Sequence, residues 1–134
     1  MSKILIADDN RDGADSLALL LGMYGHETTV AYDGAEALTC ASAFLPEAVV
    51  LDIDMPILDG YAAARVLDAL PRARRPLLIA LTAVGGAKAQ QLALDAGFDL
   101  HLIKPTHAGA LSKKIETLLS ARREDLDFAG DRRF

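Results

Sequence analysis

The segment Ala48-Val49-Val50-Leu51-Asp52-Ile53-Asp54-Met55-Pro56 places a carboxylate directly after a run of four apolar residues. An unbroken apolar run of this length is typical of a strand that is buried on both faces of a parallel sheet. In open α/β sheets, ligands bind outside the carboxyl ends of the strands. The segment therefore predicts a parallel sheet with Asp52 at its ligand-binding edge.

Three other apolar runs also end on polar side chains. Asp8 and Asp9 follow the run at 4–7, Thr82 follows the run at 77–81, and Lys104 follows the run at 100–103. Because the carboxyl ends of parallel strands meet at one edge, we expect these groups to converge. Acids, a hydroxyl and a lysine in one place are suited to a hard cation and a phosphoryl group.

Strand-length apolar runs alternate with helical-period segments five times, which predicts a doubly wound α/β fold with a parallel sheet covered on both faces. The least apolar strand, Thr28–Ala31, is expected at an edge. The Asp33 and Glu36 pair predicts the start of the second helix. Five apolar stripes at helical spacing define the predicted inward faces: 14, 17, 18 and 21; 35, 38, 41 and 45; 63, 66, 67 and 70; 89, 92, 93 and 96; and 111, 115 and 118.

The chain has 134 residues, of which 51% are hydrophobic, and this is enough for one domain with a real core. A second catalytic or DNA-binding domain would not fit. The net charge of −5 argues against direct nucleic-acid binding, and no apolar run is long enough to insert into a membrane. The single Cys40 cannot form an internal disulfide, which favours a cytoplasmic location.

After Ala121 the apolar stripe stops, and the remaining residues are mostly charged. We therefore expect a folded domain at 1–121 and a charged, mostly flexible tail at 122–134. The three arginines between Pro71 and Pro76 are interpreted as part of an exposed connection rather than a basic binding patch.

The polar groups at the strand ends could together hold Mg²⁺ and a phosphoryl group. Asp9, Asp52 and the backbone carbonyl of Asp54 could ligate Mg²⁺ directly, and Asp8 could act through a water. Lys104 would neutralise one phosphoryl oxygen as a point charge. The Thr82 hydroxyl and the Ala83 backbone N–H would donate hydrogen bonds to the others.

The motifs that carry this chemistry occur in a fixed order: Ala7-Asp8-Asp9-Asn10, then Leu51-Asp52-Ile53-Asp54-Met55-Pro56 with Asp59-Gly60, then Leu81-Thr82-Ala83, then Lys104-Pro105. In this combination, over about residues 3 to 120, the chain resembles the receiver domains of two-component response regulators. The resemblance implies a flavodoxin-like fold with five strands in the order 2-1-3-4-5 and five helices.

The resemblance also assigns roles to the site residues. Asp52 would be the phosphoacceptor, Asp8 and Asp9 the metal-binding acids, Thr82 the switch hydroxyl and Lys104 the phosphate-sensing lysine. It further implies a cis peptide bond before Pro105. The protein would take a phosphoryl group from a histidine kinase or a histidine phosphotransfer protein, catalyse only its own phosphotransfer and slow dephosphorylation, and act on a downstream protein target.

Three positions depart from the commonest receiver pattern. His101 stands where these domains often carry Tyr or Phe as a rotating switch residue, and Thr106 stands where Phe is frequent. His101 is either a working switch or an ordinary half-buried strand residue. Asp54 adds an acid beside Asp52, and we interpret its side chain as a solvated loop acid.

Other functions remain open from the sequence. Asp52-Ile53-Asp54 also resembles the nucleophile motif of haloacid-dehalogenase-type phosphatases, although Asp8-Asp9 precedes it and Met55-Pro56 follows it. An interaction module with the receiver fold but without phosphorylation is a second alternative. The chain could also be the receiver segment of a hybrid histidine kinase or a phosphorelay intermediate, although a stand-alone receiver is favoured.

Overall fold

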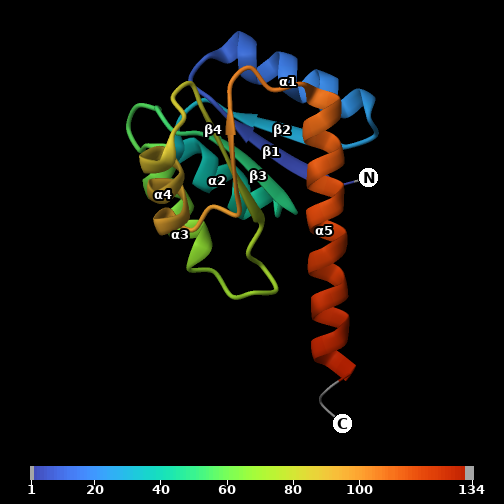
Figure 1. Ribbon diagram of the computed structural model, residues 1–134. Helices are drawn as coiled ribbons and strands as arrows, with labels where there is room; N and C mark the ends of the chain where they lie inside the picture. The colour runs from blue at the N-terminus through green and yellow to red at the C-terminus, as the bar shows by residue number, and fades with distance from the viewer. Residues whose placement is uncertain (1, 132–134) are drawn as a thin grey trace.

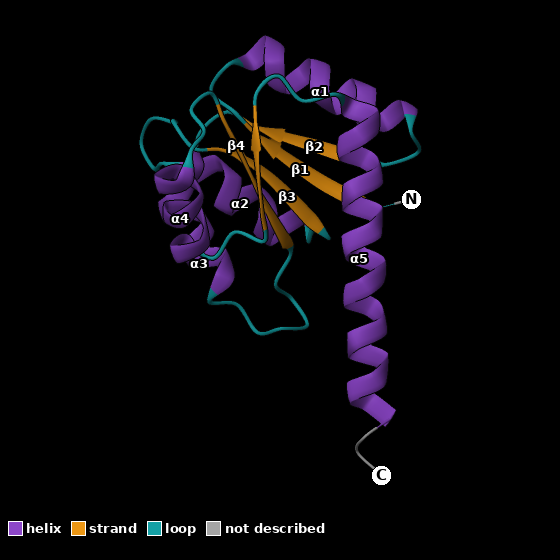
Figure 2. Ribbon diagram, in the orientation of Figure 1, coloured by secondary structure: helices purple, strands orange, loops and turns teal. Residues whose placement is uncertain are grey.

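The computed structural model describes the backbone of residues 2–131 and the side chains of residues 2–124. It contains a single parallel sheet in the order β2-β1-β3-β4-β5 (Figures 1 and 2). This confirms the predicted fold class and strand order, with β2 at an edge. The elements are β1 (Lys3–Ala7), α1 (Arg11–Met23), β2 (Glu27–Ala31), α2 (Gly34–Phe44), β3 (Ala48–Asp52), α3 (Gly60–Asp68), β4 (Leu77–Thr82), α4 (Ala87–Ala96), β5 (Leu100–Ile103) and α5 (Ala108–Asp131).

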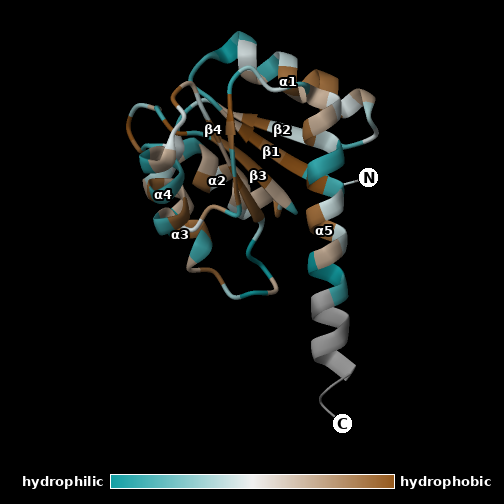
Figure 3. Cartoon of the chain, viewed as in Figure 1, coloured by the Kyte–Doolittle hydropathy of each residue, from teal (hydrophilic) through white to brown (hydrophobic). Residues whose placement is uncertain are grey.

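The sheet separates two apolar cores. Successive side chains of a strand point to opposite faces, so Ile4 and Ile6 pack with α1 and α5, whereas Leu5 packs with α2, α3 and α4. Figure 3 shows the apolar strands between the helices, which carry both hydrophilic and hydrophobic residues. The central strand β3 is buried along its whole length, which fixes Asp52 at its end.

Side-chain caps begin three helices directly after the sheet edge. Asn10 accepts a hydrogen bond from the Gly13 N–H at 3.0 Å, and Asp33 accepts one from the Glu36 N–H at 2.7 Å. At the start of α3, Asp59 accepts a hydrogen bond from the Ala62 N–H at 2.8 Å. The predicted cap at Asp33 is therefore confirmed.

The predicted inward faces of three helices are partly wrong. In α2 the structure buries Gly34, Ala37 and Ala41, whereas Ala35 and Leu45 are exposed. Val66 and Leu70 of the third stripe are exposed, as is Leu92 of the fourth. Small residues make up most of these inward faces, with Leu67 of α3 as the larger exception, because tightly packed helices leave little room for large side chains.

The helix α5 continues past Ala121, where the sequence analysis ended the domain, and reaches Asp131. Residues 122–131 are thus helical rather than a structureless tail. The physical reason is that extending an existing helix costs far less than starting one, and Arg, Glu, Leu and Ala are good helix formers. The last three residues of the predicted tail, 132–134, lie outside the described residues.

Candidate functional site

Four neighbouring strands bring the predicted site residues to one edge of the sheet. Asp52 ends β3, Thr82 ends β4, and Asp8 and Lys104 directly follow β1 and β5. Two backbone hydrogen bonds align these ends: the Ile53 N–H donates to the Leu81 carbonyl at 3.1 Å, and the Lys104 N–H donates to the Thr82 carbonyl at 2.8 Å. The sequence-predicted convergence is therefore present in the fold.

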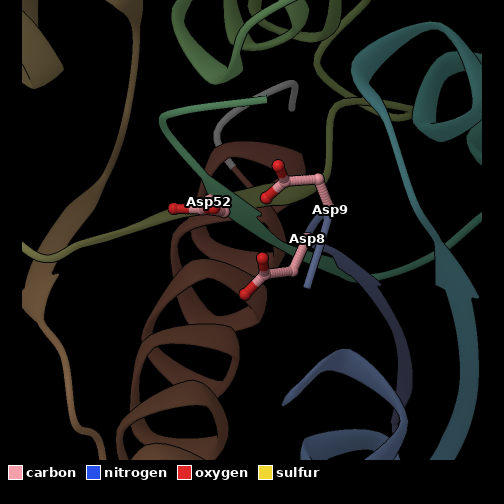
Figure 4. A group of neighbouring side chains, drawn as sticks. All are labelled: Asp8, Asp9 and Asp52. Atoms are coloured by element: carbon pink, nitrogen blue, oxygen red, sulfur yellow. The ribbon is translucent and has the colours of Figure 1, made fainter. Parts of the chain in front are cut away.

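Asp8, Asp9 and Asp52 form a cluster of carboxylates in which one oxygen from each residue lies within 4.8 Å of the others. Figure 4 shows that they come from the ends of two adjacent strands. Asp8 and Asp52 are buried, and Asp9 is exposed to solvent. The cluster can offer oxygen ligands to a hard divalent cation and still leave an open side for water or a phosphoryl group.

Lys104 bridges two of these acids. Its Nζ lies 2.9 Å from an Asp8 carboxylate oxygen and 3.3 Å from an Asp52 carboxylate oxygen. Burial by itself would lower the pKa of Lys104, but the hydrogen bond to Asp8 and the charge of Asp52 raise it overall. Lys104 is therefore a fixed positive charge beside Asp52. The Lys104–Pro105 peptide bond is cis, as expected.

Asp52 is in an unfavourable environment for a carboxylate. Burial and the neighbouring charge of Asp8 raise its pKa to about 6, although Lys104 opposes the increase. One lysine does not balance three clustered acids. The donor set and this excess of negative charge fit a divalent cation such as Mg²⁺.

Thr82 and Ala83 complete the edge next to Asp52. Thr82 is buried, and its hydroxyl oxygen accepts a hydrogen bond from the Val84 N–H at 3.2 Å. Ala83 is exposed. Because the Thr82 hydroxyl is held at the end of β4, beside β3, it can donate its own proton to an oxygen that arrives at Asp52.

The two remaining predicted positions differ in their surroundings. Asp54 is exposed in the loop after β3, two residues beyond Asp52. His101 lies within β5, opposite Ala80, and is half-buried. Its Nε2 is buried and has no hydrogen-bond partner among the described residues. His101 is therefore not part of the acidic cluster.

The sequence analysis missed the role of Gly60 in shaping the site. A Cβ at this position would lie 2.5 Å from the Asp52 carbonyl oxygen and 2.8 Å from the Ile53 Cα. The Gly60 N–H also donates to the Ile53 carbonyl at 2.9 Å. Asp59-Gly60 entered the sequence analysis only as part of the ordered motifs, although a glycine beside a strand-end motif is a signal of close backbone approach.

Comparison with known proteins identifies the family of this chain. The family model described as "Response regulator receiver domain" matches residues 4–116. The chain belongs to this family. It is 37% identical over 120 residues to transcriptional regulatory protein PrrA of Mycobacterium tuberculosis, in an alignment that covers 90% of this chain and 51% of that protein. The chain thus spans about half the length of the curated relatives it matches.

Solved receiver structures are similar over nearly their whole length. The receiver domain of Francisella response regulator 1452 has a TM-score of 0.81 at 29% identity, over 90% of this chain and 98% of that one. The receiver domain of sensor histidine kinase PA1611 from Pseudomonas aeruginosa PAO1 has a TM-score of 0.79 at 29% identity, over 89% and 98%. That structure has a magnesium ion coordinated in the active-site cleft.

The family places the protein among the phosphoacceptor signalling domains of two-component systems rather than among classical enzymes, and implies a histidine kinase partner. Receiver domains bind Mg²⁺ at an acidic site, and this chain has a cluster of acids formed by Asp8, Asp9 and Asp52. The family match also replaces the dehalogenase-type phosphatase interpretation. No helix within residues 2–131 has the length and apolar character needed to cross a membrane.

Proposed function

We propose that the protein is a phosphorylation-dependent switch that accepts a phosphoryl group on Asp52 and then changes its partner-binding face. The observation that carries this proposal is the position of Asp52 itself. It is a buried carboxylate at the end of β3, beside two other acids and within 3.3 Å of a lysine ammonium. Such a group is held ready for attack on an electrophilic phosphorus.

In the proposed reaction, an Asp52 carboxylate oxygen attacks the phosphorus of a phosphohistidine on a histidine kinase or a histidine phosphotransfer protein. An oxygen–phosphorus bond forms as the phosphorus–nitrogen bond breaks, and the bonding electrons leave with the imidazole of the donor. Lys104 neutralises one phosphoryl oxygen, while the Thr82 hydroxyl and the Ala83 N–H donate to the others.

A Mg²⁺ ion would be held by Asp9, Asp52 and the Asp54 backbone carbonyl, with Asp8 acting through a water. When bound, it supplies charge neutralisation for the phosphoryl oxygens near the acids. The magnesium ion in the PA1611 receiver domain and the clustered acids of this chain both support this assignment.

The switch would begin when the phosphoryl group recruits Thr82 and Lys104. Lys104 now pairs with Asp8 and Asp52, so a new anion on Asp52 would compete for its ammonium. Movement of the Thr82 hydroxyl toward the phosphoryl group would change the packing next to β5. His101 is the proposed responder there, because it lies in β5 next to β4 and no hydrogen bond from the described residues holds its Nε2.

The proposed downstream step is binding of a protein target, without direct contact between this domain and nucleic acid. Receiver domains resembling this chain occur in a transcriptional regulator and in a sensor histidine kinase. Phosphorylation of Asp52 would be the same reaction in either kind of protein.

Intact-mass measurement after incubation with acetyl phosphate and Mg²⁺ tests the acceptor. The wild type should gain one phosphoryl group, and Asp52→Asn should gain none. Asp54→Asn is the matched control, because it removes an exposed neighbouring carboxylate and keeps the backbone carbonyl. Equal phosphorylation of Asp52→Asn and the wild type would disprove the assignment of Asp52.

A further inference from the structure

A second charged cluster lies at the opposite end of the sheet from Asp52. A surface hollow of about 550 Å³ opens between the loop before β3, the loop between α3 and β4, and α5. Figure 1 shows the α3–β4 loop and the extended α5 at this lower end of the molecule. The lining includes five arginines and one glutamate: Arg72, Arg74, Arg75, Arg122, Arg123 and Glu47.

The charge of this hollow opposes that of the whole chain, which is −5. Some of the arginines have structural partners. Arg75 donates to Asp68 at 2.8 Å and to Asp99 at 2.9 Å, and Arg123 lies 2.8 Å from Glu47. These contacts account for the carboxylates nearest to the hollow.

Three arginines of the hollow are left without acidic partners. No carboxylate of residues 2–124 forms an ion pair with Arg72, Arg74 or Arg122. Arg122 instead donates to the backbone carbonyls of Arg72 and Arg75, which holds the loop against α5. Burial and the positive charges of Arg75 and Arg72 lower the pKa of Arg122, although the negative charge of Asp99 opposes this decrease. Among the residues whose side chains are described, these three arginines therefore remain available to an external anion.

The rest of the lining is apolar, with Leu45, Pro46 and Leu119 forming part of the wall. A hollow of this size suits a small molecule rather than a protein partner. Guanidinium groups match the oxygens of phosphate with paired hydrogen bonds, and several of them in one hollow require several negative charges close together. A phosphate chain carries its negative charges closer together than the side chains of an acidic peptide do, so it meets this requirement better.

We propose that this hollow, the arginine hollow, binds a small molecule that carries several phosphate groups, either a nucleotide or an inorganic phosphate chain. Arg72 and Arg74 contact the phosphates, and the exposed side chain of Leu45 is available to a base. Arg122 and Arg123 belong to α5 and lie beyond residues 4–116, which the receiver family model matches. It is separate from the acidic cluster and does not depend on phosphorylation of Asp52.

Calorimetric titration of the full chain with tripolyphosphate, ATP and AMP tests the proposal. The buffer contains EDTA and no Mg²⁺, so that a metal at the acidic cluster cannot recruit the phosphates. Tripolyphosphate and ATP should bind with one-to-one stoichiometry and raise the melting temperature, because a ligand of the folded state stabilises it. AMP should bind at least about tenfold more weakly, since it offers one phosphate. Tighter binding of ATP than tripolyphosphate identifies a nucleotide site, whereas equal affinity identifies recognition through phosphates alone.

Arg72→Gln and Arg74→Gln should each weaken ATP binding about tenfold, as loss of one charge-assisted contact predicts. Both side chains are exposed, so the fold should be retained. Arg65→Gln, which removes an exposed arginine of α3 outside the hollow, is the matched control and should bind normally.

Amide chemical-shift mapping of the wild type gives an independent readout that needs no variant. The shifts should gather at residues 45–47, 72–75 and 119–123. Absence of binding up to about 1 mM, an equal loss in Arg65→Gln, or shifts centred on Asp8 and Asp52 would each overturn the proposal. Tighter binding of a short oligonucleotide than of ATP would overturn the assignment of a small-molecule ligand.

Discussion

Gly60→Ala tests whether the backbone around Asp52 is shaped by close contact with α3. The new methyl group would lie 2.5 Å from the Asp52 carbonyl oxygen and 2.8 Å from the Ile53 Cα. Ordinary contacts of this kind are about 3.5 Å, so the loop or the helix must move by roughly 1 Å. Both obstacles are backbone atoms that are tied to β3, and neither can rotate away.

The expected cost combines two opposing effects. Overpacking of a tight contact typically costs about 1–3 kcal/mol, whereas alanine gains up to about 1 kcal/mol over glycine in a helix. We expect a net loss of about 1–2 kcal/mol in the free energy of unfolding. Because the displaced atoms include the peptide between Asp52 and Ile53, the rate of phosphorylation by acetyl phosphate should fall as well.

Urea unfolding followed by circular dichroism measures the stability, since the chain has no tryptophan for fluorescence. Intact mass against time measures phosphorylation. Gly22→Ala is the matched control: a Cβ at Gly22 of α1 meets no atom within 4 Å, so this variant should be as stable as the wild type or more so. Gly60→Ala with wild-type stability and phosphorylation rate would refute the close-contact argument.

Two further predictions concern charged groups. Asp9→Asn should weaken Mg²⁺ binding by about 100-fold in a calorimetric titration, because it removes a proposed ligand charge. Asp95→Asn makes an equal charge change at an exposed position of α4 and should have no effect on Mg²⁺ binding. Equal losses of affinity in the two variants would contradict the ligand role of Asp9. Burial lowers the pKa of His26, and the negative charge of Glu116 only partly opposes this decrease. The folded protein therefore keeps this imidazole neutral, whereas the unfolded chain protonates it below about pH 6.5. Stability should therefore fall as pH falls through that value, and His26→Gln should reduce this dependence in urea unfolding; identical pH dependence in the two proteins would show that His26 does not contribute.

The sequence predicted the strands, the order of elements and the convergence at the sheet edge because these depend on local patterns. An apolar run followed by Asp52 indicates a buried strand end whatever its neighbours are. The cap at Asp33 is equally local, since it joins residues three positions apart. The family resemblance supplied the strand order, and the structure confirmed it.

The inward face of α2 was harder to predict because its small residues are nearly interchangeable in an apolar pattern. Gly34 packs so closely against the Leu58 carbonyl oxygen that a Cβ there would overlap it. Leu58 is distant in sequence, so the pattern around Gly34 does not reveal this contact. Similarly, the extension of α5 beyond Ala121 could not be predicted from an apolar stripe, because the helix continues there without one.

The acidic site was determined largely by the sequence, because each of its residues lies at the end of a strand and parallel strands end together. The arginine hollow was decided only by the tertiary structure. Arg72 and Arg122 are brought together by the packing of α5 across the sheet, and no local pattern relates them. The arginine hollow is formed by three segments that meet at the far end of the sheet. Long-range packing determines there which side chains become neighbours.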